Sequence, residues 1–355
     1  MSTGAIVGDE TGLVKLVDIN GNRYDFYGEQ SREEKITDMC WKSQDENFWL
    51  VRESGVCEMW NVENSVLRKI ADLTLDVKAA GVVKSLQNES EAICYSEAGD
   101  IMVLKSRKNT SLKVVASHSI SSRKAEPVSI MDCKSCSDGI GIGGKETDLQ
   151  LIDLNTGVAT WRAKNVANDK LSLRVPVYIS QLCFLNPETD SISSGSTVLT
   201  GTGYKQVRLY DTREHSSRKP TMSLEIGEHR VTSLTCRHSC SSEAVSTMYP
   251  DVYNSGITAY IADTAGNFNV WDLRMRRRLH RLHGGCSSVR DVQFLPATPG
   301  SEQLYNYNYL ASVGLDRYLR VYDVKKHKSV KSVYLKSRST ALLLFSENCR
   351  STVSF

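Results

Sequence analysis

The sequence predicts an all-β fold, a closed ring of seven small sheets known as a β-propeller. Three observations lead to this prediction. A tight turn followed by an alternating apolar strand recurs seven times along the 355 residues. Other strand-like segments accompany each copy, and an apolar segment near the end of the sequence is left over to close the ring. Repeats of this length, each forming one sheet, are typical of propellers.

The seven copies share a Gly or Asp, or a substitute, in the turn and an Asp or a substitute at the end of the strand. They span Gly8–Asp18, Glu53–Asn61, Ser96–Lys105, Gly143–Asp153, Gly203–Asp211, Asp263–Asp272 and Gly314–Asp323. Neighbouring copies begin about 43 to 61 residues apart, against roughly 40–45 for a plain blade, so the chain carries loop insertions. The polar insertions 186–196, 238–255 and 297–308 are interpreted as tolerated surface loops.

The copy that begins at Asp263 shows the expected make-up of one blade. Strand-like segments at Val231–Thr235 and Ile257–Ile261 precede it, and the basic segment Arg276–His280 follows it. Together they give four strands with period-two alternation. The basic run 274–281 falls on an outer strand, where charge protects a sheet edge against aggregation.

Ring closure is also predicted. The chain opens on Ala5–Val7, a second strand with no innermost strand before it, while Ala341–Phe345 is a spare innermost strand. We expect the late segment to complete the first blade, which leaves no edge unpaired. The resulting organisation is a propeller over residues 1–346 and a short tail over 347–355.

Composition narrows the class of protein. The sequence is 40% hydrophobic and 24% charged, which is ordinary for a globular protein, and it contains no apolar run of about 20 residues that could cross a bilayer. The N-terminus lacks the features of a signal peptide, so we expect a cytosolic or nuclear location. In such a reducing compartment, cysteines in apolar runs such as Cys40, Cys57, Cys94 and Cys183 are interpreted as buried thiols.

No cofactor, metal or catalytic site is predicted. Cys133 with Cys136, and Cys236 with His238 and Cys240, have ligand-like spacings, but neither set has the fourth ligand of a structural metal site. The sequence has no Gly-x-Ser-x-Gly and no His-x-x-x-His. Gly139 to Lys145 has the spacing Gly-x-x-x-x-Gly-Lys, but Glu146 follows where a phosphate-binding loop has Ser or Thr, and Gly141–Gly144 is expected in a strand without the helix that a phosphate site needs. We therefore expect a binding platform and not an enzyme.

Positive charge is expected on one rim of the ring. The loops that enter the innermost strands and the turns between the two middle strands share this rim, which we call the front rim. Its cations are Arg32, Lys35, Arg123, Lys124, Lys145, Lys164, Lys170, Arg174, Lys205, Arg230, Arg290, Arg317, Lys336 and Arg338. Such a surface suits a phosphate backbone or an acidic partner, although charged loops are also ordinary in soluble proteins.

Trp271–Asp272, Tyr210–Asp211 and Tyr322–Asp323 resemble the Trp-Asp dipeptide of the WD-repeat family, and Trp60–Asn61 is a near variant. This resemblance implies the propeller fold but no particular task. The chain departs from the family pattern in two ways. Gly285–Cys286 replaces the usual Gly-His, and the turn aspartate present at Asp263 and Asp316 becomes Lys145 and Tyr204 elsewhere.

The junction from Trp161 to Tyr178 is longer than a blade connection needs. Its Arg162-Ala-Lys-Asn-Val, Asn168-Asp169 and Leu173-Arg174-Val-Pro176 segments resemble the WD-repeat assembly factors of the large ribosomal subunit, typified by the yeast Nsa protein and its metazoan counterparts. Further matches are Gly144-Lys145-Glu146, Gly203-Tyr204-x-Gln206-Val-Arg208, Gly314-Leu-Asp316-Arg317 and Val333-Tyr-Leu-Lys336-Ser.

The resemblance implies a nucleolar factor on early 60S precursors that acts in pre-rRNA processing. It would be a monomer held among other assembly proteins and pre-rRNA, with no membrane partner, and an AAA-type ATPase would release it. Family members carry a lysine-rich tail after the propeller, whereas this sequence stops at Phe355.

Two alternatives stay open: a generic WD-repeat scaffold, for example a ubiquitin-ligase substrate reader, and an RNA binder that acts alone. Asp316 and Asp169 could serve only to build turns, and Arg174 only to pair with Asp169. Trp161 and Tyr178 are interpreted as packing residues. The residues predicted to contact a partner are Arg162, Lys164, Asn165, Asn168, Asp169, Arg174, Lys145, Lys205, Arg290, Arg317, Lys336 and Arg338.

Overall fold

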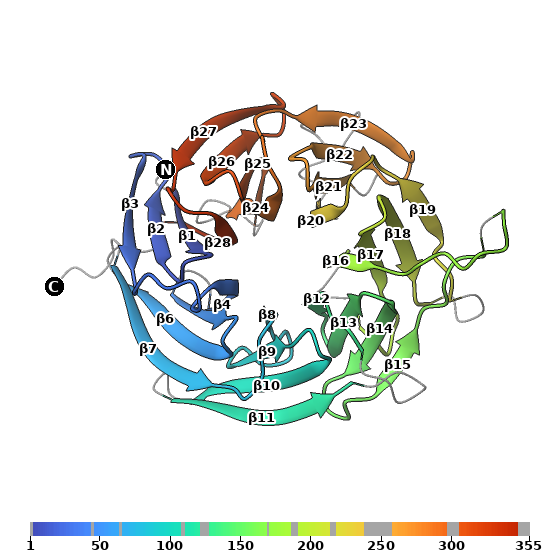
Figure 1. Cartoon of the computed structure of the whole chain (residues 1–355), viewed down its shortest axis with the longest axis horizontal. Coiled ribbons are helices and arrows are strands. Elements are labelled where there is room, and N and C mark those ends of the chain that lie inside the picture. The colour runs from blue at the N-terminus through green and yellow to red at the C-terminus, as the bar shows by residue number, and fades with distance from the viewer. Residues whose placement is uncertain are drawn as a thin grey trace.

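Each recurring segment forms the hairpin of two middle strands in one blade of a seven-bladed β-propeller, as Figure 1 shows. The computed structural model describes residues 3–43, 46–63, 66–107, 111–120, 128–168, 170–185, 191–213, 218–237, 258–296 and 305–346. Within these ranges every blade is a four-stranded antiparallel sheet whose first strand faces the central channel. The predicted fold class is confirmed.

The blades are numbered from the N-terminus, and the strands of each are given from the channel outward. Blade 1 consists of β28 (Ser339–Ser346), β1 (Thr3–Asp9), β2 (Val14–Asp18) and β3 (Arg23–Tyr27). Blade 2 consists of β4 (Ile36–Ser43), β5 (Asn47–Arg52), β6 (Val56–Glu63) and β7 (Val66–Thr74). Blade 3 consists of β8 (Gly81–Lys84), β9 (Glu91–Tyr95), β10 (Asp100–Arg107) and β11 (Ser111–Ser119).

The other four blades follow in chain order. Blade 4 consists of β12 (Asp132–Ser135), β13 (Gly139–Gly144), β14 (Thr147–Asp153) and β15 (Ala159–Arg162), and blade 5 of β16 (Ile179–Phe184), β17 (Thr197–Thr202), β18 (Gln206–Asp211) and β19 (Met222–Glu225). Blade 6 consists of β20 (Val231–Arg237), β21 (Thr258–Asp263), β22 (Phe268–Asp272) and β23 (Arg277–Leu282). Blade 7 consists of β24 (Val289–Pro296), β25 (Tyr305–Gly314), β26 (Tyr318–Asp323) and β27 (Lys328–Tyr334).

Closure of the ring is confirmed. β28 pairs antiparallel with β1, and Ala5 lies opposite Leu344. The apolar side chains of both strands are buried, including Val7 and Leu342. The last strand described thus supplies the innermost strand of the first blade, so neither strand is left as an open edge.

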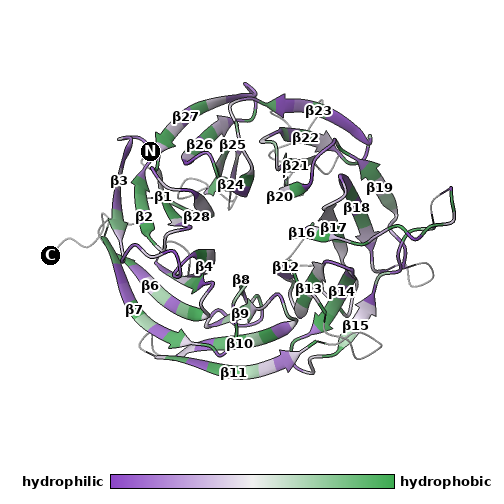
Figure 2. Cartoon of the chain, viewed as in Figure 1, coloured by the Kyte–Doolittle hydropathy of each residue, from purple (hydrophilic) through white to green (hydrophobic). Residues whose placement is uncertain are grey.

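The hydrophobic core lies between adjacent blades. Figure 2 shows apolar residues concentrated on the middle strands and hydrophilic residues on outer strands such as β23. Trp49, Tyr210, Tyr260 and Tyr322 are among the largest side chains that are fully buried. Each blade has two apolar faces, and stacking them around a ring buries both without a separate core.

The cysteines behave largely as small core residues. Cys57 and Cys94 are fully buried, whereas Cys40 and Cys183 are half-buried. Burial raises the pKa of Cys136 to about 11, so this thiol is protonated at neutral pH. His238 and Cys240 lie outside the described residues.

Outer strands carry a recurring irregularity. In blades 2, 3, 4, 6 and 7 the outer strand has a β-bulge, so one residue has no partner opposite it. In blades 3 and 7 these residues are Val115 and Val330, both more than half exposed. Bulges twist an edge strand and discourage pairing with another chain, which suits strands that run around the outside of the ring.

Candidate interaction face

The front rim surrounds the mouth of the central channel. Backbone hydrogen bonds join the turn between the middle strands to the loop that enters the innermost strand, as from Glu10 N to Arg338 O (3.0 Å) and from Thr264 N to Arg230 O (3.1 Å). A cavity of about 790 Å³ opens there, lined by residues of all seven blades. The predicted placement of these loops on one rim is therefore correct at both contacts.

Bulges in the innermost strands direct side chains into this mouth. In five blades the strand has an extra residue: Thr37, Ser180, Thr232, Arg290 and Thr340. All five line the cavity. Four have hydroxyls that donate to a carbonyl of the neighbouring strand, for example Thr340 Oγ1 to Gly8 O at 3.2 Å. The fifth is Arg290, where an exposed cation stands in place of a bulge hydroxyl.

Buried aspartates of three innermost strands tie neighbouring blades together. Asp38 and Asp291 each follow a bulge residue, whereas Asp132 begins a strand without a bulge. Asp38 accepts from Val82 N (3.2 Å), Asp132 from Leu182 N (2.6 Å) and Asp291 from Leu342 N (2.9 Å), each across to the next blade. Burial raises the pKa of Asp38 to about 7 and also raises the pKa values of Asp132 and Asp291. These three carboxylates therefore have a structural task.

The mouth of the channel is electrostatically mixed. Its carboxylates are Glu10, Asp38, Glu53, Glu97, Asp100, Asp132 and Asp291, and its cations are Lys35, Lys78, Lys134, Arg230 and Arg290. Of the residues predicted to contact a partner, Arg290 alone lines this cavity. Lys134 was not predicted. In two innermost strands an Asp stands two residues after the first apolar residue (Ile36-Thr37-Asp38, Val289-Arg290-Asp291). This recurring Asp is the sequence signal from which the charges around the channel mouth could have been predicted.

Several front-rim cations pair with acids on the same rim. Lys35 lies 3.0 Å from Glu53, Arg338 lies 3.6 Å from Glu10, and Arg174 lies 3.2 Å from Glu146. The suggested pairing of Arg174 with Asp169 stays a prediction, because Asp169 lies outside the described residues. Surface pairs of this kind weaken the local electric field. The front rim therefore has a weaker positive field than the number of its lysines and arginines alone indicates.

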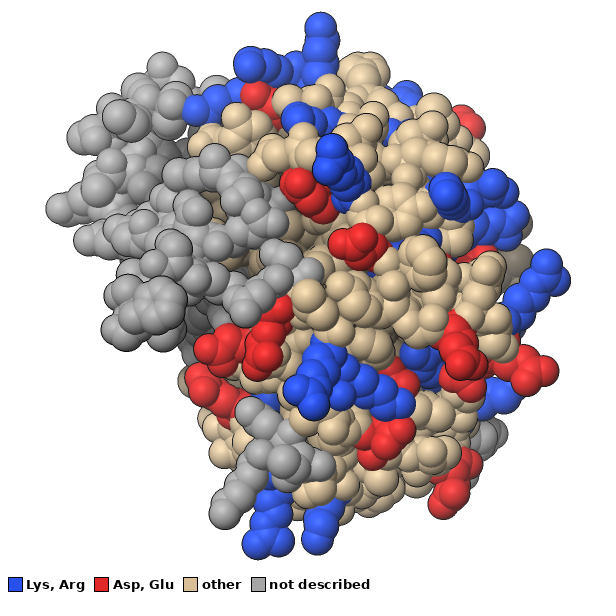
Figure 3. Space-filling model, turned by 90° about the vertical axis from the view of Figure 1, so that its left-hand side faces the viewer, with Lys and Arg blue, Asp and Glu red and all other residues tan. Residues whose placement is uncertain are grey.

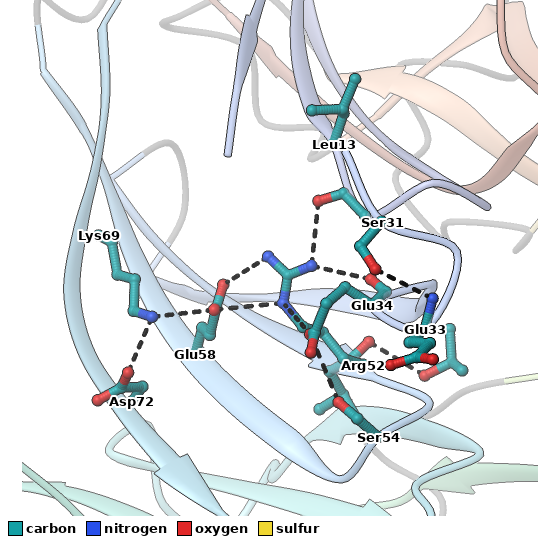
Figure 4. Close-up of polar contacts among 12 residues, drawn as sticks. Leu13, Ser31, Glu33, Glu34, Arg52, Ser54, Glu58, Lys69 and Asp72 are labelled. Atoms are coloured by element: carbon teal, nitrogen blue, oxygen red, sulfur yellow. Dashed lines mark hydrogen bonds and ion pairs between the residues drawn. The ribbon is translucent and has the colours of Figure 1, made fainter. Parts of the chain in front are cut away.

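The most connected of these charges is Arg52, at the junction of blades 1 and 2 (Figure 4). Its guanidinium donates to both carboxylate oxygens of Glu58, each at 3.2 Å, and to the carbonyl of Gly12 at 3.0 Å. Lys69 joins Glu58 to Asp72. Burial raises the pKa of Glu58, but the hydrogen bonds and charge of Arg52 outweigh it and lower the pKa overall.

Blade 1 has the same pair with the charges exchanged. Asp9 stands where Arg52 does, and Lys15, six residues later, stands where Glu58 does. The two atoms Asp9 Oδ2 and Lys15 Nζ are 3.0 Å apart and buried. Asp9 Oδ1 also accepts from the backbone of Thr11 and Leu13, as Asp263 Oδ1 does from Ala265 and Asn267. Asp9 is therefore the counterpart of Asp263, whereas Asp316 lies two residues further along its turn and accepts from Tyr318 N.

Two of the predicted contact residues occupy positions that favour glycine. One residue of each middle turn has a positive φ: Gly12, Gly55, Gly99, Glu146, Lys205, Gly266 and Arg317. Glycine adopts this conformation without strain, and a charged side chain does not. The backbone is therefore strained at Lys205 (φ 68°) and Arg317 (φ 66°), and each of these residues has an exposed cationic side chain. Lys336, in the loop before β28, has a φ of 66° as well.

Residues 163–168 and 170–178, which we call the arm, extend past β18 and β19 in Figure 1. Its two sides are held together by Asn165 Nδ2 donating to Val175 O (2.6 Å) and by Asn168 Nδ2 donating to Ser172 O (3.0 Å). Lys164 N donates to Arg218 O of blade 5 at 2.9 Å, which ties the base of the arm to the ring. Asn165 and Asn168 thus shape the arm itself.

The surface of the arm combines apolar and cationic side chains. Leu171 is 78% exposed and Leu173 is 60% exposed, and the nearby Lys164 is also exposed. Arg162 lies at the end of β15, half-buried and opposite Gln150.

The aromatic residues of this junction pack as expected. Trp161 meets Tyr210 edge-on, with ring centroids 6.2 Å apart. Tyr178 lies edge-on to Tyr204, and the Arg230 guanidinium covers its ring at 4.6 Å. These contacts fix the base of the arm against blades 5 and 6.

In the described ranges, no three His, Cys, Asp or Glu side chains are arranged as metal ligands. The same ranges contain no helix long and apolar enough to cross a membrane.

Comparison with solved structures agrees with the fold. The WD40 β-propeller domain of Doa1 superposes with a TM-score of 0.61, covering 86% of this chain and 85% of that chain at 13% sequence identity. At this identity the likeness shows the fold alone. No family model matches the sequence.

Two groups of curated proteins are similar over most of the chain. WD repeat-containing protein 74 of Homo sapiens is 28% identical over 350 residues, which cover 95% of this chain and 80% of that protein. Ribosome biogenesis protein nsa1 of Schizosaccharomyces pombe is 22% identical over 380 residues, covering 96% and 88%. The resemblance inferred from the sequence is confirmed: WD repeat-containing protein 74 and ribosome biogenesis protein NSA1 are homologues of this chain.

Proposed function

We propose that this propeller is a non-enzymatic assembly factor in ribosome biogenesis that docks on precursors of the 60S subunit in the nucleolus during pre-rRNA processing. A homologue named for ribosome biogenesis supports the process. The surface that carries the proposal is the arm, because its exposed leucines lie beside exposed cations. The arm is fixed by hydrogen bonds and is therefore ordered before it meets a partner, which lowers the entropic cost of binding.

The docking face extends from the arm along the front rim. Lys145 and Lys205 lie in the middle turns of blades 4 and 5 beside it, while Arg290, Arg317, Lys336 and Arg338 continue the face on blades 7 and 1. A protein partner would cover Leu171 and Leu173, and pre-rRNA or an acidic protein segment would meet the cations. Release by an AAA-type ATPase, and a single copy of the chain per particle, complete the proposal.

The test compares an arm variant with a matched control. The arm variant is Lys164→Glu, Leu171→Ser and Leu173→Ser, all at exposed positions. The control is Lys113→Glu, Val114→Ser and Val115→Ser on β11, which changes one exposed lysine and two exposed aliphatic residues in the same way. Tagged proteins are expressed in cells and followed through a sucrose gradient.

We expect the arm variant to leave the fractions of large-subunit precursors while the control remains, with equal thermal unfolding for both. Normal sedimentation of the arm variant would reject the assigned face. Purification of the unaltered chain with ubiquitin-ligase subunits, and without pre-ribosomal proteins, would instead favour the generic adaptor.

A further inference from the structure

A band of like charge runs along the outside of blades 6 and 7. Its members, which we call the basic flank, are exposed arginines and lysines of β23, β27 and the turns before them. They are Arg274, Arg276, Arg277, Arg278, Arg281, Lys325, Lys326, Lys328 and Lys331. In Figure 1, β23 and β27 follow one another along the outer circumference of the ring.

The structure joins the two basic runs into one surface. The chain leaving β23 pairs with β27 of the next blade: His283 N donates to His327 O, and Ser329 N donates to His283 O, each at 3.3 Å. The rings of His280 and His327 stack with centroids 3.6 Å apart. Burial and the neighbouring His327 lower the pKa of His280 to about 4, so the charge of the flank at neutral pH comes from its arginines and lysines.

Acidic residues are missing from this part of the sequence. No Asp or Glu occurs between Leu273 and Arg290 or between Val324 and Ser346. The carboxylates that precede each run, Asp272 and Asp323, are buried and accept backbone N–H groups of their own turns. Of the flank lysines, Lys326 reaches Asp323 at 3.5 Å.

The same strand position looks different in other blades. On β7 of blade 2, Lys69 is held between Glu58 and Asp72. Figure 3 views the side of the ring that carries β3 and β7, and red and blue side chains are interspersed over its lower half.

We propose that the basic flank binds the phosphate backbone of RNA. This inference rests on the proposed function, which places the chain in a particle rich in RNA. A field of one sign over two adjacent strands attracts a polyanion, and arginine matches phosphate geometry in two-pronged contacts. β23 and β27 have six and seven residues, so each extends about 20 Å, enough to follow several phosphates. The large apolar side chains exposed there are Met275, Val330 and Tyr334, and the nine cations outnumber them three to one, which favours a polyanion over an apolar protein interface.

The test uses labelled single-stranded oligouridine RNA and the purified full chain, with anisotropy measured as salt rises. The flank variant is Arg277→Glu with Lys328→Glu, opposite the terminal Asp272 and Asp323 of the third strands. The control is Arg68→Glu with Lys113→Glu, at the corresponding positions of blades 2 and 3, opposite Asn61 and Lys105. All four are exposed, so the variants differ only in location.

We expect the flank variant to bind RNA at least about tenfold more weakly than the control, and its salt dependence to flatten by about 0.7 for each phosphate that it no longer neutralises. Equal losses in both variants, or binding that ignores salt, would overturn the assignment. So would polyglutamate competing as well as the RNA does, because the flank would then be a site for acidic protein. An unaltered chain that fails to bind RNA but still sediments with 60S precursors would reject this inference and leave the proposed function standing; the reverse result would reject the proposed function alone.

Discussion

The front rim and the basic flank are both rich in cations, yet they use them differently. On the front rim, Lys35, Arg338 and Arg174 each pair with a glutamate, and Arg52 is buried among hydrogen-bond acceptors. On the flank, nine exposed cations lie in two runs of the chain. The carboxylates that precede these runs, Asp272 and Asp323, accept backbone N–H groups of their own turns. A formal net charge of +3 therefore averages over a surface of paired charges and a surface of like charges. The comparison predicts that substitutions of paired rim cations change stability, whereas those at the flank change RNA binding.

The largest effect is expected at the buried pair of the rim. Arg52→Met should lower the free energy of unfolding by about 3 to 5 kcal/mol, because Glu58 would be left buried without its main partner. Lys35→Met removes an exposed pair and should cost less than about 1 kcal/mol. Urea denaturation of both variants measures the difference. Equal effects of the two substitutions would show that the burial of Arg52 confers no special role.

A smaller effect that depends on pH is expected in the channel. Burial raises the pKa of Asp38 to about 7 from the ordinary 3.8, so between these values the folded state holds a proton that the unfolded state has released. Stability from this group therefore falls as pH rises from about 4 to 7. Asp38→Asn removes that dependence, so the variant should gain on the unaltered chain as pH rises. Denaturation at several pH values tests this, and a constant difference would contradict it.

Strain at the middle turns gives the next effect. Lys205→Gly and Arg317→Gly should each raise the free energy of unfolding by up to about 1 kcal/mol, because glycine adopts their positive φ freely. The same changes should weaken association with 60S precursors. Lys145→Gly, at a neighbouring residue without a positive φ, is the control and should not stabilise. A variant that loses both stability and binding would indicate that the cation serves the fold.

The smallest effect on stability is expected at the flank. Arg277→Glu with Lys328→Glu should change the free energy of unfolding by less than about 0.5 kcal/mol, since both side chains are exposed on an outer strand. Its effect on RNA affinity should nevertheless exceed that of any rim variant with unchanged folding. Thermal unfolding and anisotropy on the same samples measure the loss of stability and the loss of RNA affinity. A large loss of stability would show that the two flank residues serve the fold.

The fold is readable from the sequence because its signals are local and repeated. The turn-strand pattern recurs in every blade, and Ala341–Phe345 has no other partner than the strand at Ala5–Val7. Aligning the seven copies also places Lys205 and Arg317 at the position of Gly12 and Gly55. The candidate site is harder to predict from the sequence, because which charges pair depends on contacts in three dimensions and not on spacing along the chain. Arg174 of the arm meets Glu146 in the middle turn of blade 4, and no spacing in the sequence indicates that contact.

The flank shows the same limit from the other side. The run at Arg274–Arg281 is plain in the sequence, where it favours protection of a strand edge. Its neighbour in space is the run at Lys325–Lys331, about fifty residues later and in another blade. One basic strand suggests solubility, whereas two side by side suggest a ligand. Only the packing of His283 against β27 distinguishes the two interpretations.

The pairing of β1 with β28 has a consequence for how the protein is made. A chain growing from its N-terminus can complete blades 2 to 7 one after another, but β1 must wait for residues 339–346. Until then the nascent ring is a horseshoe with an open strand at one end. A stalled or shortened chain would display that strand to any neighbour able to add its own. Correct closure therefore requires that synthesis has reached residues 339–346, beyond the last strand of blade 7.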